Sequence, residues 1–336
     1  MTRVALKELE APDPALETAL RGRLDDVENA LLEAVASDHQ LVRESAQYLL
    51  RAGGKRFRPL LVLLGSRFGD PTDERLVPGA VAVELTHLAT LYHDDVIDEA
   101  AFRRGIPSAN SRFDNTIAIL TGDFLFARAS GIAADLGTAT SRLFAETIAK
   151  VCDGQIRERA ILGRADVTPD AYLDVIRLKT GALIATACRL GGLLSEAADD
   201  VIEGLARLGE ALGLAFQLSD DIMDLVSDEA TLGKKPGADL AEGVYTLPVI
   251  VALHDDGDGR GAELRELLEA GPPDGERLAR ALELVRSDGT LDQAREAVGR
   301  EVRRAISEVE QLPAGTPADA LVHVATYIAG RCGATT

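Results

Sequence analysis

The sequence lacks tryptophan, and aromatic residues make up only 4% of its 336 residues. Its three cysteines, Cys152, Cys188 and Cys332, include no CxxC pair, which argues against a disulfide framework and a cysteine-based zinc site. Unpaired thiols are typical of a reducing compartment, so we expect a cytoplasmic protein. Ala and Leu abound instead, and both favour closely packed helices.

Positive charge is also scarce. Lys and Arg total 36 against 55 Asp and Glu, which gives a formal net charge of −19. Binding to nucleic acid needs a basic surface, so we exclude nucleic acid as a partner. No uninterrupted apolar run reaches about 18 residues, so we expect no transmembrane segment and at most transient membrane contact.

Helical periodicity dominates what is present. Apolar residues recur at three- and four-residue steps, as in residues 15–35, 143–162 and 201–226. Alternating strand patterns do not occur in series, and Gly- or Pro-containing breaks separate the helical windows. This pattern predicts an all-α protein, and the length allows one large domain or two smaller ones.

Two aspartate clusters lie within this helical pattern. The first is DDVID (94–98) and the second is DDIMD (220–224); together they supply Asp94, Asp95, Asp98, Asp220, Asp221 and Asp224. A spacing of four residues places the first and last carboxylates of each cluster on one helix face, where they repel. A hard divalent cation relieves that repulsion, and carboxylate-bound Mg²⁺ commonly binds a phosphate as well. We interpret the clusters as two acidic walls that grip a diphosphate through Mg²⁺.

Basic residues form the complementary pattern. GGKRFRP (53–59) places Lys55, Arg56 and Arg58 after a Gly-Gly turn, where Lys and Arg can hold a phosphate without metal. The structural alternative is a solvated charge run at a helix start. Arg103 and Arg104 are adjacent and point in different directions, so they could serve two anions or form salt bridges.

Six further residues accompany the clusters. Lys179-Thr180 lies in an apolar window, where a Lys is costly to bury without an anion. Gln217 precedes Asp220 by three residues, and Lys234 and Lys235 follow the second cluster in a Gly-rich segment. His87 precedes Asp94 by two helical turns, although a lone His is commonly a satisfied structural donor. These sets suggest two diphosphates, one held by metal and aspartates and one by Lys and Arg.

The ordered set GGKRFRP, HDDVID, RRG, KT, FQLSDDIMD and GKKPGADL resembles the trans-isoprenyl (polyprenyl) diphosphate synthases, over roughly residues 45 to 250. The resemblance implies a single domain over residues 1–336, an all-helical fold around a deep central cavity, usually assembled as a homodimer. It implies that isopentenyl diphosphate is condensed with an allylic diphosphate, using about three Mg²⁺ ions per active site. The allylic diphosphate leaves with help from the metal, and the alkene attacks the resulting cation.

Residue roles follow from the same resemblance. Asp94, Asp98 and Asp220 correspond to Mg²⁺ ligands, supported by Asp95, Asp221 and Asp224. The allylic substrate would contact Arg103, Lys179, Thr180, Gln217 and Lys234, whereas isopentenyl diphosphate would contact Lys55, Arg58, His87 and Arg104. Many family members have Pro where this chain has Lys235, so the resemblance assigns Lys235 no role.

Product length is read from the helix before Asp94. Ala89 and Thr90 lie one turn before Asp94, roughly 6 Å below the cation site, and Thr86 lies one turn further. All three side chains are small, where short-chain members typically carry aromatic ones. We therefore predict an open tunnel and a product of roughly thirty to fifty carbons. The alternative is that a bulky residue elsewhere, such as Phe126 or Phe144, closes the floor.

Three other readings remain. A synthase of the same family could stop at a fifteen- or twenty-carbon product. A terpene cyclase also uses an aspartate-rich helix, but it needs no second diphosphate site and usually mixes Asn, Ser and Glu in its second metal motif. A non-catalytic partner subunit would be expected to have lost acidic ligands or phosphate-binding bases, and this chain keeps both.

Overall fold

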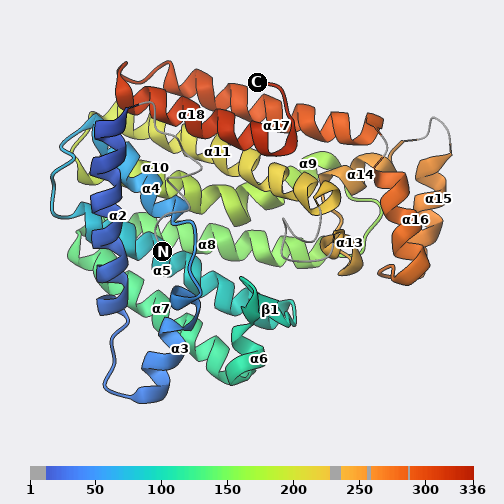
Figure 1. The fold of residues 1–336 in the computed structure, drawn as a ribbon, viewed down its shortest axis with the longest axis horizontal. Coiled ribbons are helices and arrows are strands. Elements are labelled where there is room, and N and C mark those ends of the chain that lie inside the picture. The colour runs from blue at the N-terminus through green and yellow to red at the C-terminus, as the bar shows by residue number, and fades with distance from the viewer. Residues whose placement is uncertain (1–12, 228–235, 256–258, 287) are drawn as a thin grey trace. The chain divides into compact units, whose positions relative to one another are not determined.

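The computed structural model describes residues 13–227, 236–255, 259–286 and 288–336. Helices dominate these ranges, which confirms the predicted all-α class (Figure 1). In chain order the described elements are α2 (Pro14–Ala34), α3 (Gln40–Arg51), α4 (Phe57–Gly65), η1 (Ser66–Phe68), α5 (Leu76–Ile97), β1 (Phe102–Arg103), β2 (Ile106–Pro107), α6 (Ala109–Phe113), α7 (Asn115–Asp135), α8 (Thr138–Ile161), α9 (Pro169–Ile176), η2 (Arg177–Gly181), α10 (Ala182–Leu194), α11 (Asp199–Val226), α13 (Ala238–Ala241), α14 (Leu247–Leu253), α15 (Arg260–Glu269), α16 (Gly275–Val285), α17 (Asp288–Val309) and α18 (Thr316–Cys332).

The chain forms two compact units. The first comprises residues 1–148, 183–209 and 308–323, and the second comprises residues 149–182, 210–307 and 324–336, within the described ranges. The first aspartate cluster belongs to the first unit and the second cluster to the second. The expected single domain over residues 1–336 stays a prediction, as does the central cavity.

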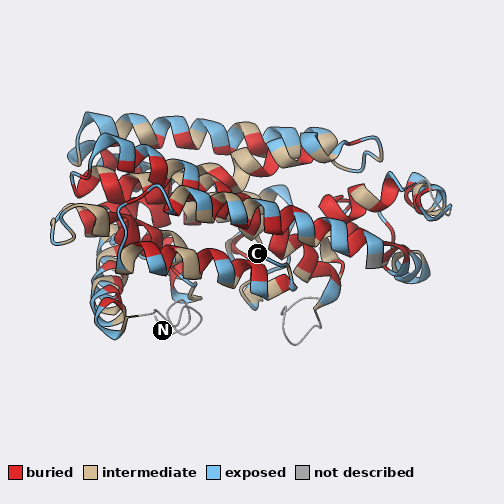
Figure 2. Ribbon diagram, turned by 90° about the horizontal axis from the view of Figure 1, so that it is seen from above, coloured by how far each residue is buried: buried red, intermediate tan, exposed pale blue. Residues whose placement is uncertain are grey.

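Local sequence signals set the helix starts. Asp13 caps α2 by accepting a 2.8 Å hydrogen bond from the Ala15 N–H, and Pro14 occupies the first helical position. Thr168 and Pro169 start α9 in the same way. Along α2 the buried residues follow helical spacing: Leu16, Leu20, Leu24, Val27 and Leu31. Figure 2 shows such buried stripes alternating with exposed ones along many of the helices.

Helix α5 is the structural centre of the first unit. It packs on α2, α4, α6 and α7, and residues from Gly79 to Ala89 are buried with the exception of His87. This burial explains why its sequence is nearly uniformly apolar until the aspartates. Its last turn is partly exposed, and there it carries Asp94 and, directly after the helix, Asp98.

A small β-hairpin follows α5, which the sequence analysis did not anticipate. Phe102 pairs with Pro107 and Arg103 with Ile106 in an antiparallel register. The turn between them contains Arg104 (φ 55°) and Gly105 (φ 77°). Strands of two residues are too short to show the alternation that predicts a strand, and the RRGIP segment gave only a turn signal.

Helix α7 is the most apolar long helix with an open face. By length and composition alone α7 could cross a membrane, because an 18-residue window of it has a mean hydropathy of 1.4. In the structure 33% of that window is buried. This qualifies the expectation that no such segment exists. The helix also carries Asp123 and Arg128 and packs along α5, which is the behaviour of a packed helix with one apolar face outward.

Candidate active site

The first aspartate cluster occupies the last turn of α5. The Asp98 N–H donates to the Asp94 carbonyl at 2.8 Å, so the two residues lie one turn apart on one face, as predicted. Asp98 is exposed and Asp94 is half-buried. Two carboxylates on one turn present oxygen atoms of the kind that hard divalent cations prefer.

Asp95 has a different environment. It is fully buried, and its two oxygens accept hydrogen bonds from Arg103 Nε at 2.7 Å and from the Ala109 N–H at 3.1 Å. Asp95 therefore ties α5 to the hairpin and to the start of α6. It positions Arg103, whereas Asp94 and Asp98 lie on the more open side of the helix.

Within GGKRFRP, Arg56 serves the fold. It is buried in the left-handed region (φ 49°), and its guanidinium contacts Glu28 Oε1 at 2.6 Å and Glu84 Oε1 at 3.0 Å. Burial lowers the pKa of Arg56, but Glu84 and Glu28 more than offset it and leave the pKa raised. A Cβ at Gly54 would lie 2.7 Å from Arg56 and 3.1 Å from Arg104, so this close approach requires glycine.

The other basic residues gather around His87. His87 is half-buried by surface area, and its partial removal from water lowers its pKa well below the usual value. The nearby charges of Arg58, Arg104, Arg56 and Arg103 lower it further. His87 is therefore a neutral imidazole among guanidinium groups. A neutral ring can donate to a diphosphate oxygen without adding another like charge to the cluster. The sequence placed His87 on the Asp94 side of α5, and the structure adds the arginines around it.

The adjacent arginines of the hairpin point to different partners, as the sequence suggested. Arg103 pairs with Asp95, while Arg104 donates to the carbonyls of Leu49, at 3.0 Å, and Gly53. Burial is the main cause that lowers the pKa of Arg104, followed by the neighbouring Arg56 and Arg103, against which Glu84 acts. Arg104 thus braces the Gly53-Gly54 turn that carries Lys55.

The second aspartate cluster lies near the end of α11, in the second unit. Asp221 is buried and accepts from the Tyr172 hydroxyl at 2.6 Å and from Gln217 Nε2 at 3.0 Å. Burial raises the pKa of Asp221 to about 8, while these two hydrogen bonds oppose the shift. Gln217 in turn accepts from Thr180 Oγ1 at 3.0 Å, which links α9, η2 and α11 through one chain of hydrogen bonds.

The remaining carboxylates of this cluster also have protein partners. Asp220 Oδ1 accepts from Arg331 NH2 of α18 at 2.7 Å, and the Arg331 guanidinium lies 5.1 Å from the centre of the Phe216 ring. Asp224 Oδ2 accepts from the Asp239 N–H at 3.4 Å. Asp220 is the most exposed of the three aspartates, which leaves it the one best placed to meet a cation.

Lys179 and Thr180 lie in an irregular turn. Residues Arg177–Gly181 form a π-helical turn, closed by a hydrogen bond from the Ala182 N–H to the Arg177 carbonyl. The Lys179 ammonium pairs with Glu158 of α8, which is the anionic partner that the sequence analysis required. Gly154 allows α8 to approach this turn, because a Cβ there would lie 2.5 Å from the Lys179 backbone nitrogen.

Sequence reasoning missed Tyr172, Glu158 and Arg331, which contact predicted site residues. Helical spacing marks Tyr172 as a buried position, but nothing local identifies a partner 49 residues away. Lys234 and Lys235 lie outside the described residues. Across the described ranges, no three His, Cys, Asp or Glu side chains form a ready metal-binding group. Asp95, Asp221 and Asp224 are buried, which leaves Asp94, Asp98 and Asp220 as the aspartates of the two clusters that keep some exposed surface.

The chain-length positions lie in the interior of the first unit. Thr86 and Ala89 have no exposed surface, whereas Thr90 is half-buried. The Thr90 hydroxyl donates to the His87 carbonyl at 2.7 Å, and the Thr86 hydroxyl donates to the Ala82 carbonyl at 2.8 Å. Both hydroxyls are satisfied by the helix itself, so the helix side here presents methyl groups. Phe144 is buried and Phe126 packs against His93.

Comparison with known proteins identifies relatives over nearly the whole chain. The family model described as polyprenyl synthetase matches residues 39–285. Nonaprenyl diphosphate synthase of Mycobacterium tuberculosis is 40% identical over 96% of each chain. Heptaprenyl diphosphate synthase component 2 of Geobacillus stearothermophilus is 37% identical over 94% of this chain and 98% of its own. The crystal structure of geranylgeranyl pyrophosphate synthase from Corynebacterium glutamicum, complexed with calcium and isoprenyl diphosphate, superposes with a TM-score of 0.85, 44% identity, and 96% and 98% coverage.

Proposed function

The chain belongs to the polyprenyl synthetase family and is a prenyltransferase, and on this premise we propose that it condenses isopentenyl diphosphate with an allylic diphosphate into a long-chain trans-polyprenyl diphosphate. The observation that carries this proposal is the pairing of two kinds of diphosphate-binding chemistry. Asp94, Asp98 and Asp220 are at least partly exposed aspartates, and a separate basic cluster lies around His87.

The open aspartates fit a role in holding Mg²⁺. Mg²⁺ keeps several water ligands and is usually bound by one or two carboxylates together with substrate phosphates, so a complete protein cage is not expected. Asp94 and Asp98 on one turn, and Asp220 on α11, supply that partial set. About three Mg²⁺ ions per site would withdraw electron density from the leaving allylic diphosphate. The calcium and isoprenyl diphosphate named for the Corynebacterium glutamicum structure support a divalent-metal site in this family.

The basic cluster fits a diphosphate that needs no metal. We assign Lys55, Arg58, His87 and Arg104 to isopentenyl diphosphate, with neutral His87 as a hydrogen-bond donor between the arginines. Arg56 is excluded from this role by its buried bonds to Glu28 and Glu84. The allylic diphosphate is assigned to the residues that join or follow the aspartate clusters: Arg103, Lys179, Thr180, Gln217 and Lys234.

Product length is the part of the proposal that most needs measurement. The nonaprenyl and heptaprenyl names of two relatives support a long chain, and the geranylgeranyl name of a third is the twenty-carbon alternative. Of the three small residues along α5, the half-buried Thr90 supports passage of a growing chain, whereas Ala89 and Thr86 have no exposed surface. We propose roughly thirty to fifty carbons, which corresponds to a path of several helical turns.

Substitution along α5 tests this path. Thr90→Tyr or Ala89→Tyr is expected to shorten the product, because a ring one turn before Asp94 blocks chain growth. Ala89 is fully enclosed, so the half-buried Thr90 gives the variant with the lower cost to folding. Chromatography of the dephosphorylated products measures the shift. An unchanged product from a folded Thr90→Tyr enzyme would contradict the path.

We propose further that the enzyme is a cytoplasmic homodimer that uses the open face of α7 as its contact. Ile119 and Leu120 are 43% and 57% exposed on that helix, and neighbouring exposed apolar side chains of this kind are a common element of protein contacts. The free thiols of Cys152, Cys188 and Cys332 support a reducing compartment. Transient contact with a membrane would let a long-chain product leave.

The decisive experiment is a product-length assay. Purified protein is incubated with Mg²⁺, labelled isopentenyl diphosphate and, separately, ten-, fifteen- and twenty-carbon allylic diphosphates. A ladder that ends at thirty or more carbons, and that disappears with EDTA, is the expected result. A longest product of fifteen or twenty carbons would contradict the long-chain assignment and indicate a short-chain synthase. Cyclised hydrocarbon made without isopentenyl diphosphate would indicate a cyclase, and no reaction would favour a non-catalytic partner subunit.

A further inference from the structure

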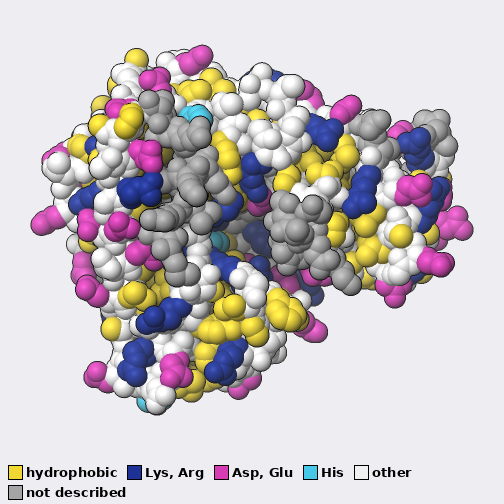
Figure 3. Space-filling model, viewed as in Figure 1, with side chains coloured by type: hydrophobic (Ala, Val, Ile, Leu, Met, Phe, Trp, Pro, Cys, Tyr) yellow, Lys and Arg dark blue, Asp and Glu magenta, His cyan; other side chains and the backbone are white. Residues whose placement is uncertain are grey.

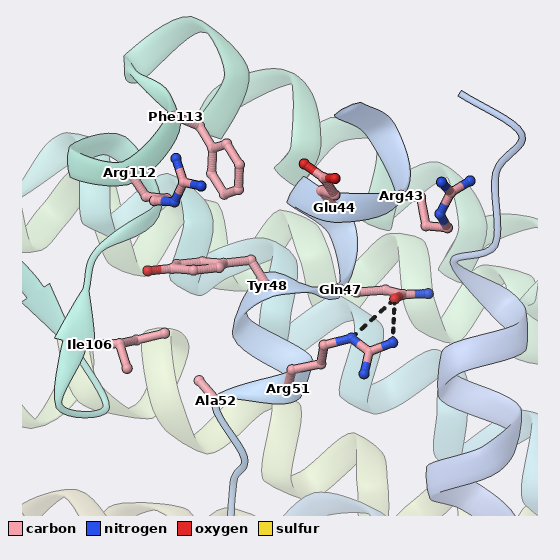
Figure 4. Close-up of a pocket in the computed structure, with 9 residues that line it drawn as sticks. All are labelled: Arg43, Glu44, Gln47, Tyr48, Arg51, Ala52, Ile106, Arg112 and Phe113. Atoms are coloured by element: carbon pink, nitrogen blue, oxygen red, sulfur yellow. Dashed lines mark hydrogen bonds between the residues drawn. The ribbon is translucent and has the colours of Figure 1, made fainter. Parts of the chain in front are cut away.

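A pocket in the first unit is lined by none of the residues assigned above. Its volume is about 620 Å³, and residues of α3, the hairpin and α6 line it (Figure 4). None of its lining residues belongs to the aspartate clusters or to the set assigned to isopentenyl diphosphate. The proposed reaction therefore assigns no ligand to this pocket.

Three arginines stand around this pocket: Arg43, Arg51 and Arg112. Within the described ranges none of them forms an ion pair. Arg51 donates to the neutral amide of Gln47 at 2.8 Å, Arg43 donates to the Ser37 carbonyl at 2.7 Å, and Arg112 lies over the Phe113 ring at 5.1 Å. Glu44, the one acidic residue of the lining, instead accepts from Gln40 at 2.7 Å.

The chain carries a net charge of −19, and some exposed arginines, such as Arg157 and Arg280, pair with neighbouring carboxylates. Arg51 and Arg112 are also exposed, so an anion from solution can reach them. Guanidinium groups match the geometry of phosphate oxygens and are weakly hydrated, so a phosphate is the anion that they fit best.

The floor of the pocket is apolar. Tyr48 and Phe113 meet edge to face, with ring centres 5.2 Å apart, and Ile106 and Ala52 extend this surface. The Tyr48 hydroxyl is already used in a 2.8 Å hydrogen bond to the Pro107 carbonyl, so its ring offers mainly an apolar face. Figure 3 shows basic and hydrophobic side chains side by side over this part of the molecule.

We propose that this pocket binds an amphiphilic phosphate, with Arg51 and Arg112 as the phosphate-binding groups and an apolar tail against Tyr48, Phe113 and Ile106. A soluble alkyl phosphate and the headgroup of an anionic phospholipid share this chemistry. Exposed Phe102 (71%), on the strand that pairs with the one carrying Ile106, adds apolar surface beside the pocket. The site is independent of the proposed reaction, and its test does not require turnover.

Octyl phosphate is the soluble probe, titrated calorimetrically into the full chain in EDTA so that metal-dependent binding is absent. We expect saturable binding that weakens about tenfold or more in Arg51→Gln/Arg112→Gln, since two charge-assisted contacts are lost. Arg157→Gln/Arg280→Gln removes the same charge from exposed, ion-paired arginines and should bind like the unaltered chain. Lys55→Gln reports any octyl phosphate that binds instead at the metal-free cluster assigned to isopentenyl diphosphate, because Lys55 belongs to that cluster and does not line this pocket.

Vesicles distinguish the two sources of phosphate. Co-sedimentation with phosphatidylglycerol vesicles, but not phosphatidylcholine vesicles, that is lost in Arg51→Gln/Arg112→Gln would identify a lipid headgroup. Binding of octyl phosphate alone would identify a soluble phosphate ester. The proposal is overturned if the pocket variant keeps full affinity while folded, if Lys55→Gln abolishes binding instead, or if neither probe binds.

Discussion

At the scale of single residues, two adjacent residues of GGKRFRP have different roles, one in the proposed substrate site and one in stabilising the fold. Lys55 is exposed beside the Gly53-Gly54 turn, whereas Arg56 is buried between Glu28 and Glu84. Arg56→Ala should destabilise the protein by about 3–5 kcal/mol, because Glu84 would be left buried without its cation. Lys55→Ala should leave stability unchanged and raise KM for isopentenyl diphosphate. Urea denaturation and steady-state kinetics on both variants separate the two effects, and a reversed outcome would contradict the assignment.

The first aspartate cluster divides in the same way. Asp98→Ala should lower turnover about a hundredfold or more without lowering the melting temperature, because an exposed carboxylate near Asp94 is lost. Asp95→Ala should lower the melting temperature, since Arg103 and the Ala109 N–H would lose a buried acceptor. Normal turnover of Asp98→Ala with saturating Mg²⁺ would contradict the assignment of Asp98 as a metal ligand.

The sequence predicted which residue types matter but not their partners. The D-D-x-x-D spacing correctly placed Asp94 and Asp98 on one face, because helix geometry alone decides that. It could not predict that Tyr172, Arg331 or Glu158 would meet Asp221, Asp220 and Lys179. Those contacts join distant segments, and no local pattern encodes them.

At the scale of elements, the close packing of α8 on the π turn can be tested through Gly154. Gly154→Ala should destabilise the protein by about 1–3 kcal/mol and reduce turnover, because its methyl group would push the Lys179 backbone. Gly330→Ala, in α18 with open space around it, should be neutral or slightly stabilising. Thermal unfolding and activity of this pair measure the effect, and equal behaviour of both variants would contradict it.

The long helices were the predictable elements. Residues 15–35, 143–162 and 201–226 correspond to α2, the latter part of α8, and α11, because each has a sustained apolar stripe. The hairpin and the π turn were not predicted. Two-residue strands are below the length of any periodic signal, and a π turn changes helical phase by a single residue.

At the scale of the whole molecule, assembly is the property to test. Leu120→Glu should convert a homodimer into monomers, because it places a charge in the proposed apolar contact of α7. Leu41→Glu, at a 40% exposed position on α3, is the matched control and should remain dimeric. Light scattering coupled to size-exclusion chromatography gives the mass. If the Leu120→Glu protein stays dimeric, the dimer contact does not involve this face of α7.

Sequence alone was sufficient for the family and the fold class of the molecule. The ordered motifs made the polyprenyl synthetase assignment, which the family match over residues 39–285 confirms. Product length is different in kind, because it depends on the volume left between packed side chains. Thr86, Ala89 and Thr90 indicate small side chains, but the sum of their neighbours decides how far a chain can grow.

The π turn at Arg177–Gly181 has a consequence for how this helix tolerates change. It contains one residue more than a regular α-helix would use, with Ala182 bonded five residues back to Arg177. Deleting Leu178 would restore the usual ladder and rotate every preceding side chain by about 100° relative to those that follow. The shortened chain could gain regularity while Lys179 and Thr180 lost their directions toward Glu158 and Gln217. A more regular helix would favour loss of the extra residue of the π turn, whereas the contacts of Lys179 and Thr180 require that residue.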